Sequence, residues 1–255
     1  MKYGICTGPE HIAEAAALGY DYVELAASSI MAMDEAGVQD VKNQLEAANT
    51  QAEAFNVLFP GTFRLIQGTP DEEIRAYLRE TMRRIGGLGG RTVVFGSGGA
   101  RRVPEGISYG EAFRRLADVC RMIGDAAAEE GITAAVEPLR YEETNIINTL
   151  SEGAALEAAA DHPNVRLLAD AYHVWCNGEP VSQIQVIGRF AHIHISAVGR
   201  GVPVDEELPR YQEFLSALRS AGYDGRISVE ARIGDFREEA GKALQVLKKG
   251  VMTGA

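Results

Sequence analysis

Short apolar runs alternate with longer amphipathic segments along the whole chain. A short apolar run bounded by turn-forming residues is typical of a strand that is buried on both faces. We therefore expect strands at Tyr3–Cys6, Tyr22–Leu25, Ala52–Val57, Thr92–Phe95, Thr133–Glu137, Val165–Asp170, Phe190–Ile195 and Ile227–Glu230.

The longer segments between these runs have the periodicity of helices. Examples are Asp71–Leu88, Tyr109–Glu129 and Tyr211–Ala221. In the first of them, Ile74, Leu78 and Met82 recur at four-residue intervals, which places them on one face of a helix. Glycine often stands between such a segment and the next strand, where its tolerance of the left-handed conformation ends a helix.

Strand-then-helix units follow one another eight times without a linker or a low-complexity segment. This order predicts a single (β/α)8 TIM barrel over residues 1–255, because the length of 255 residues is close to the about 250 residues that such a barrel takes. An open doubly wound sheet is the alternative. It favours a glycine-rich phosphate turn after the first strand, and "CTGPEH" is a poor one.

The net charge and the cysteine content exclude several classes of binding partner and site. The net charge is -11, and no basic stripe is present, so we expect neither nucleic acid nor an anionic membrane. No apolar run reaches membrane-spanning length. Cys6, Cys120 and Cys176 are too few and too far apart for a disulfide framework or a zinc knuckle. These features predict a cytoplasmic protein with a small-molecule partner, and they leave a homo-oligomer open.

Polar residues stand where several of the expected strands end, and active sites of TIM barrels form at that end. These strand-end residues are Glu24, Asn56, Glu137, Asp170, His194 and Glu230. A single strand that ends on a carboxylate is common. Three such strands and a histidine strand, all in the C-terminal half, indicate a functional site.

The segment "HIHIS" places two histidines in one strand. Side chains alternate between the faces of a strand, so His192 and His194 point the same way. If both face the barrel axis, His194 lies nearer the active end and His192 lies one layer deeper. We expect His194 to be a ligand and His192 to support it or to belong to the core.

Glu137, Asp170, His194 and Glu230 could converge on one divalent metal ion. Three carboxylates and one imidazole suit Mn²⁺, with Mg²⁺ or Co²⁺ as substitutes. The alternative is that the carboxylates form ordinary salt bridges and that His194 is a hydrogen-bonded core residue.

Four segments of the C-terminal half resemble motifs of one known family. They are "VEPLRYEETNIINT", "ADAYH", "HIHISAVGR" and "GYDGRISVE". Together they resemble the sugar isomerase/epimerase group of xylose-isomerase-like TIM barrels, which includes D-tagatose 3-epimerase and hydroxypyruvate isomerase. The resemblance implies that the metal ligands are Glu137, Asp170, His194 and Glu230, and that the substrate contacts are Glu143, His173 and Arg200.

The resemblance also implies an activity. A ketose or related small hydroxyketone would lose a proton beside its carbonyl, and a metal-stabilised enediolate would form. Glu137 and Glu230 would be the catalytic pair that removes and returns the proton. The segment "GVPVDE" after Arg200 lacks the family's more usual Pro-Gly-Glu-Gly run, so the choice of sugar stays open.

Rival functions share this architecture. One is an inosose dehydratase-like lyase, which expels water after enolisation. Another is an endonuclease IV-like AP endonuclease, but it needs many histidines, and five histidines with a net charge of -11 argue against it. A non-catalytic binding barrel is a third, and the four expected ligands argue against that one.

The loop "FGSGGARR" bears on whether the substrate is a free sugar or a sugar phosphate. Its backbone amides with Arg101 and Arg102 could form a phosphate cradle. We favour a flexible, solvated loop, and hence a free sugar over a sugar phosphate.

Overall fold

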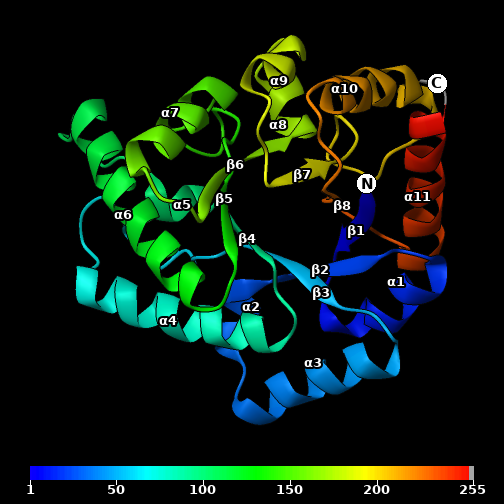
Figure 1. Cartoon of the computed structure of the whole chain (residues 1–255), viewed down its shortest axis with the longest axis horizontal. Coiled ribbons are helices and arrows are strands. Elements are labelled where there is room, and N and C mark those ends of the chain that lie inside the picture. Colours follow the sequence, from blue (N-terminus) through cyan, green and yellow to red (C-terminus); the bar gives the residue numbers. More distant parts are fainter. Residues whose placement is uncertain (253–255) are drawn as a thin grey trace.

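The structure, a computed structural model, describes residues 1–252, with only the backbone described for residues 251 and 252, so the last three residues of the predicted domain lie outside the described residues. Parallel strands form a closed barrel in sequence order, and helices surround it (Figure 1). The strands are β1 (Lys2–Cys6), β2 (Tyr22–Ala26), β3 (Ala52–Asn56), β4 (Thr92–Phe95), β5 (Thr133–Val136), β6 (Val165–Asp170), β7 (His192–Ile195) and β8 (Arg226–Val229). The predicted TIM barrel is confirmed, and pairing of β1 with β8 excludes the open sheet.

The predicted strand ends differ from the observed ones at two residues that matter for the site. Glu137 and Glu230 each stand one residue past the end of their strand. The amide of Glu137 nevertheless donates to Phe95 O at 3.2 Å, and the amide of Glu230 donates to Ile195 O at 3.1 Å. The neighbouring strand therefore holds both glutamate backbones in place.

The helices are α1 (Ile12–Leu18), α2 (Ala27–Ala32), α3 (Glu35–Ala47), α4 (Asp71–Gly87), α5 (Gly98–Arg101), α6 (Tyr109–Glu129), α7 (Leu150–Ala160), α8 (Ala171–Cys176), α9 (Ser182–Ile187), α10 (Leu208–Ser220) and α11 (Phe236–Met252), with 3₁₀ turns at Pro9–His11 and Asp205–Glu207. Helix α6 has its predicted bounds. Helix α10 begins earlier than the predicted Tyr211, because Pro209 in its first turn suits a helix start. Within residues 1–252, no helix is long and apolar enough to cross a membrane.

The barrel interior has an apolar side and a polar side. Val94, Ala135 and Leu168 form a buried cluster that is separate from the larger core between strands and helices. On the polar side, Tyr22 fills the space beside β1, where a Cβ atom on Gly4 would overlap the Tyr22 ring. This glycine therefore leaves room for a large polar side chain inside the barrel.

The amino end of the barrel is closed by an ion-pair group. The carboxylate of Glu53 on β3 contacts Lys2 Nζ at 2.8 Å and the Arg226 guanidinium at 2.5 Å. Burial alone would raise the pKa of Glu53, but the hydrogen bonds from these two cations outweigh it and lower the pKa. The group joins β1, β3 and β8 at the end opposite to the predicted site.

The expected flexible, solvated loop at "FGSGGARR" is wrong for Arg101. Its side chain is fully buried, and its guanidinium donates to Phe95 O at 3.1 Å, Glu137 O at 2.8 Å and Ile147 O at 3.2 Å. Burial lowers the pKa of Arg101 to about 10. Carbonyl oxygens thus occupy both terminal nitrogens of the buried guanidinium, and Arg101 ties the loops after β4 and β5 together.

We predict that Arg101→Met lowers the free energy of unfolding by about 3 kcal/mol, because it leaves buried carbonyls without donors. Urea denaturation followed by circular dichroism measures this loss. The control is Arg102→Met, since Arg102 is exposed and donates one hydrogen bond, to Glu143 O at 2.9 Å. Its effect should stay within about 0.5 kcal/mol. Equal losses in the two variants would contradict the role of Arg101.

Candidate active site

Four predicted metal ligands meet at the carboxyl end of the strands. Glu137, Asp170, His194 and Glu230, which we call the four-ligand cluster, each offer one ligand atom, and these atoms lie within 4.8 Å of one another. Strand register brings them together, since Asp170 pairs with His194 across β6 and β7. Three of the four are buried, and Glu230 is partly buried.

The donor set fits one divalent ion. His194 Nδ1 lies 3.2 Å from Glu137 Oε1 and 3.0 Å from Glu230 Oε2, so the imidazole and the carboxylates face a common point. Mostly oxygen donors with one nitrogen suit Mn²⁺ and Mg²⁺ better than the nitrogen- and sulfur-rich sites of zinc. The structure therefore contains a candidate metal site, and the identity of the ion stays a prediction.

The two carboxylate oxygens of Asp170 make different contacts. Oδ1 accepts a hydrogen bond from the Tyr172 amide at 2.8 Å and caps helix α8. Oδ2 faces the site, where it meets the Arg200 guanidinium. The helix cap thus orients the carboxylate toward the cluster.

Gly96, directly after β4, leaves space for the carboxylate of Glu137. A Cβ atom at this position would overlap Glu137 Oε2. Because Glu137 is buried and already bonded to His194, its carboxylate has few other places to go.

The two histidines of β7 lie at the heights that the sequence predicts. His194 is level with Asp170, and His192 is level with Leu168, one layer deeper. Both rings are fully buried. The carboxylate of Glu24 lies between them, 2.8 Å from His192 Nε2 and 2.9 Å from His194 Nε2.

Sequence reasoning marked Glu24 and Asn56 as strand-end residues but assigned them no role. Glu24 contacts both histidines, and Asn56 Nδ2 donates to Glu230 Oε1 at 3.3 Å. Their expected position at strand ends was the available signal, although β2 continues past Glu24 to Ala26. It could not show which residues they touch across the barrel, because that depends on strand register and side-chain direction.

Two of the three predicted substrate contacts face the cluster. His173 Nε2 lies 3.5 Å from Asp170 Oδ2, and its Nδ1 accepts from the Arg140 amide at 3.2 Å. The Arg200 guanidinium binds Asp170 and Glu230, and it stacks 4.6 Å above the Tyr172 ring.

Glu143, the third predicted substrate contact, lies apart from the others in the structure. Its carboxylate pairs with Arg140 Nε at 2.7 Å, and it is partly exposed. Within residues 1–252, no hydrogen bond or ion pair joins the Glu143 side chain to the four-ligand cluster.

The pKa values of the two predicted catalytic glutamates shift in opposite directions. Burial, reinforced by the charge of Glu230, raises the pKa of Glu137. Burial would also raise the pKa of Glu230, but His194 and Arg200 outweigh it and lower the pKa to about 2. The pKa of His194 is raised well above its usual value, because the surrounding glutamates outweigh its burial. Opposed pKa shifts in a carboxylate pair are typical of acid and base partners.

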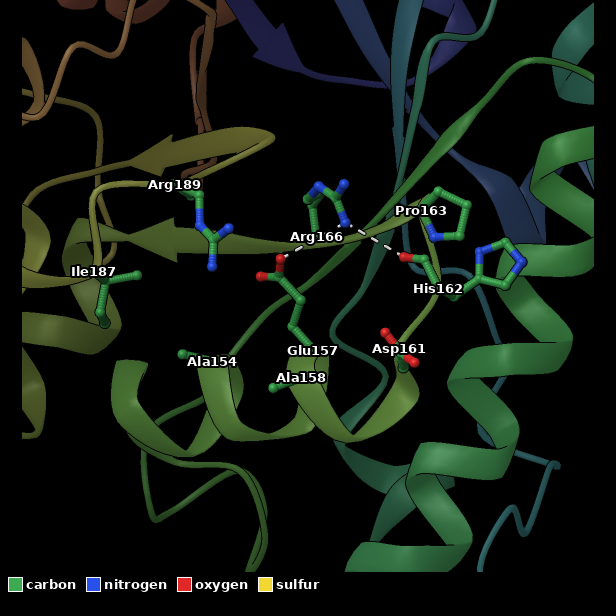
Figure 2. A pocket seen from close by; sticks show the side chains of 9 residues that line it. All are labelled: Ala154, Glu157, Ala158, Asp161, His162, Pro163, Arg166, Ile187 and Arg189. Carbon is green, nitrogen blue, oxygen red and sulfur yellow. Dashed lines mark hydrogen bonds and ion pairs between the residues drawn. The ribbon is translucent and has the colours of Figure 1, made fainter.

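A hollow of about 530 Å³ lies at the other end of the barrel. Figure 2 shows Glu157, Arg166 and Arg189 among the residues that line it. Glu157 lies 3.7 Å from Arg166, which also donates to His162 O at 3.3 Å. Arg166 stands near the start of β6, whereas Asp170 ends that strand. The hollow is therefore remote from the carboxyl end, where TIM-barrel active sites form.

Fold and site together define a TIM barrel with a carboxylate-rich cluster at the carboxyl end of its strands. The sequence model for the xylose isomerase-like TIM barrel matches residues 12–250. The chain belongs to this family.

Known relatives narrow the class further. L-ribulose 3-epimerase of Methylomonas sp. (strain DH-1) is 31% identical over 233 residues, 86% of this chain and 77% of that protein. The putative hydroxypyruvate isomerase of Streptomyces coelicolor is 28% identical over 245 residues, 89% and 86% of the two chains. D-allulose 3-epimerase from Methylomonas sp., solved with D-allulose, has a TM-score of 0.84 and 25% identity, covering 98% of this chain and 96% of that one. The chain is an enzyme of this sugar epimerase and isomerase kind.

We predict that Gly96→Ala weakens metal binding about tenfold or more, because the added methyl group displaces the carboxylate of Glu137. Titration of the metal-free protein with Mn²⁺ measures the affinity. Gly99→Ala is the control, since a Cβ atom there meets no atom of the described residues within 4 Å. If both alanine variants bind Mn²⁺ as the wild type does, Gly96 does not set the position of Glu137.

We also predict that metal affinity falls as the pH falls. The raised pKa of His194 means that its imidazole holds a proton at a higher pH than usual, and a metal ion must displace that proton. Calorimetric titration with Mn²⁺ in two buffers of different ionisation enthalpy should show proton release. Equal heats in both buffers, with an affinity independent of pH, would contradict this picture.

Proposed function

We propose that the chain epimerises a ketose at the carbon beside its carbonyl, with one divalent ion held by the four-ligand cluster. The observation that carries the proposal is the convergence of three carboxylates and one imidazole within 4.8 Å. Mn²⁺ is the proposed ion, with Mg²⁺ or Co²⁺ as substitutes. When bound, the ion would polarise the carbonyl and the adjacent hydroxyl of the sugar and stabilise the negative charge of an enediolate.

Glu137 and Glu230 would move the proton. Glu230, whose pKa is lowered, is ionised and takes the proton from carbon. Glu137, whose pKa is raised, returns a proton to the opposite face of the same carbon. One proton leaves and one arrives, so the net result is inversion without oxidation or reduction. The roles exchange in the reverse direction.

Other side chains would orient the sugar. His173 and Arg200 border the cluster, and both can donate hydrogen bonds to substrate oxygens. Glu143 would reach the substrate only after its carboxylate leaves Arg140. We propose a cytoplasmic site of action, which agrees with three free cysteines.

The relatives select the substrates to test first. L-ribulose and D-allulose are named for the two epimerases, and hydroxypyruvate is named for the isomerase. Isomerisation of a small hydroxyketone is thus the second candidate function. It needs the proton to return to the neighbouring carbon rather than to the opposite face.

The test uses the purified chain loaded with Mn²⁺ and each sugar in deuterated water. We expect the 3-epimer as product, with deuterium at the carbon that inverts. Product chromatography and mass spectrometry identify both. Conversion of hydroxypyruvate alone would select the isomerase function. Loss of water from the substrate would select the lyase, and no turnover of any of these compounds would refute the proposal.

Glu137→Gln and Glu230→Gln test the proton carriers. We predict that each lowers the turnover number by about 10²–10⁴-fold, because an amide cannot accept the proton. Each variant should still exchange deuterium into one epimer, since the remaining glutamate serves one face. Glu157→Gln, in the remote hollow of Figure 2, is the control and should leave turnover unchanged. Wild-type epimerisation by both site variants would exclude the two-glutamate mechanism.

A further inference from the structure

Glu24 forms a buried carboxylate bridge between the two histidines of β7. One carboxylate oxygen lies 2.8 Å from His192 Nε2, and the other lies 2.9 Å from His194 Nε2. All three side chains are fully buried. Both contacts are within hydrogen-bond distance, and solvent does not compete with them.

This geometry determines which ring nitrogen carries hydrogen. An ionised carboxylate only accepts hydrogen bonds, so Nε2 of each ring must be the donor. The other nitrogen of His194, Nδ1, is the one that faces Glu137 and Glu230. With hydrogen held at Nε2, Nδ1 is the nitrogen whose proton a metal ion would displace, and its lone pair would then be directed into the four-ligand cluster.

The surroundings of His192 support the same assignment. His192 Nδ1 is buried and has no hydrogen-bond partner among the described residues. An acceptor left without a partner is less costly than a buried N–H donor left without one, so the neutral ring keeps its hydrogen on Nε2. Ser228 Oγ lies 3.3 Å from that Nε2 and 2.9 Å from the Tyr22 hydroxyl. Polar contacts therefore gather on the side of His192 that faces Glu24.

We propose that Glu24 is the positioning residue of the metal centre: it holds the Nε2–H of His194 so that Nδ1 is presented to the metal ion. Histidines that bind metals generally donate their second ring N–H to a carboxylate or carbonyl, which sets the ring orientation and strengthens the ligand. The inference rests on the proposed metal site. It adds that metal binding depends on Glu24, which is not itself one of the four proposed ligands.

The test is Glu24→Gln in the full chain, stripped of metal. The amide keeps the shape but presents one N–H group to one of the two rings. If that ring is His194, its Nε2 must accept, hydrogen moves to Nδ1, and the ligand is lost. If that ring is His192, its hydrogen moves to the partnerless Nδ1, which strains the network that supports His194.

We expect Glu24→Gln to bind Co²⁺ and Mn²⁺ about 10–100-fold more weakly in a chelator competition, the range for supporting partners of metal ligands. The visible absorption of bound Co²⁺ should also change, since the ligand field depends on how Nδ1 binds. Glu24→Asp keeps a carboxylate and should recover part of the affinity. It carries the test alone if Glu24→Gln does not fold.

Glu53→Gln is the matched control. Glu53 is also a buried strand glutamate with two partners, but it closes the opposite end of the barrel through Lys2 and Arg226. It should lower thermal stability without changing metal affinity or the Co²⁺ spectrum. The comparison separates a loss of stability from a loss of positioning.

The outcomes are distinct. Wild-type affinity and an unchanged Co²⁺ spectrum in Glu24→Gln would overturn the role of Glu24, as would wild-type affinity in Glu24→Asp if only that variant folds. An equal loss of affinity in Glu53→Gln would also overturn it. If the wild-type chain binds no divalent ion, the proposed function fails as well, and the variants are not needed to show it.

Discussion

Three carboxylates of like charge are held together at the carboxyl end of the barrel, largely shielded from water. Burial and mutual repulsion both disfavour this arrangement, so it requires nearby positive charge. Within the described chain, His194 and Arg200 contact the carboxylates directly, and a divalent ion would supply more. The same opposition of charges moves the pKa values of Glu137 and Glu230 in opposite directions, which acid–base chemistry can use.

The rest of the structure keeps these groups in one place. Arg101 binds the backbone carbonyl of Glu137, so a buried cation fixes the loop that carries a proposed ligand. Gly96 leaves the space that the side chain of Glu137 occupies. Deeper in the barrel, Gly4 makes room for Tyr22, which contacts Ser228 beside His192. The site is thus supported by the loops at the carboxyl end of the strands and by the polar side chains deeper in the barrel.

The fold and the positions of the proposed ligands follow from local sequence patterns. Apolar runs alternate with amphipathic segments, and the runs end on Glu137, Asp170 and Glu230, or contain His194. These features need only the period of each element and the rule that barrel sites form at strand ends.

Other features depend on contacts between distant segments, and no local pattern reveals them. "FGSGGARR" has the composition of a solvated loop, yet Arg101 is buried because three carbonyl oxygens from separate segments meet there. Glu24 lies within β2, and only closure of the barrel brings it to β7. Glu143 fits its motif, but in the structure it pairs with Arg140.

Anomalous X-ray diffraction at the manganese edge, from crystals of the Mn²⁺-loaded chain, tests the central claim most directly. The account predicts one peak per chain, bound by carboxylate oxygens of Glu137, Asp170 and Glu230 and by Nδ1 of His194, with Nε2 still on Glu24. A peak bound through Nε2 of His194, a peak elsewhere, or no peak among these four side chains would contradict it.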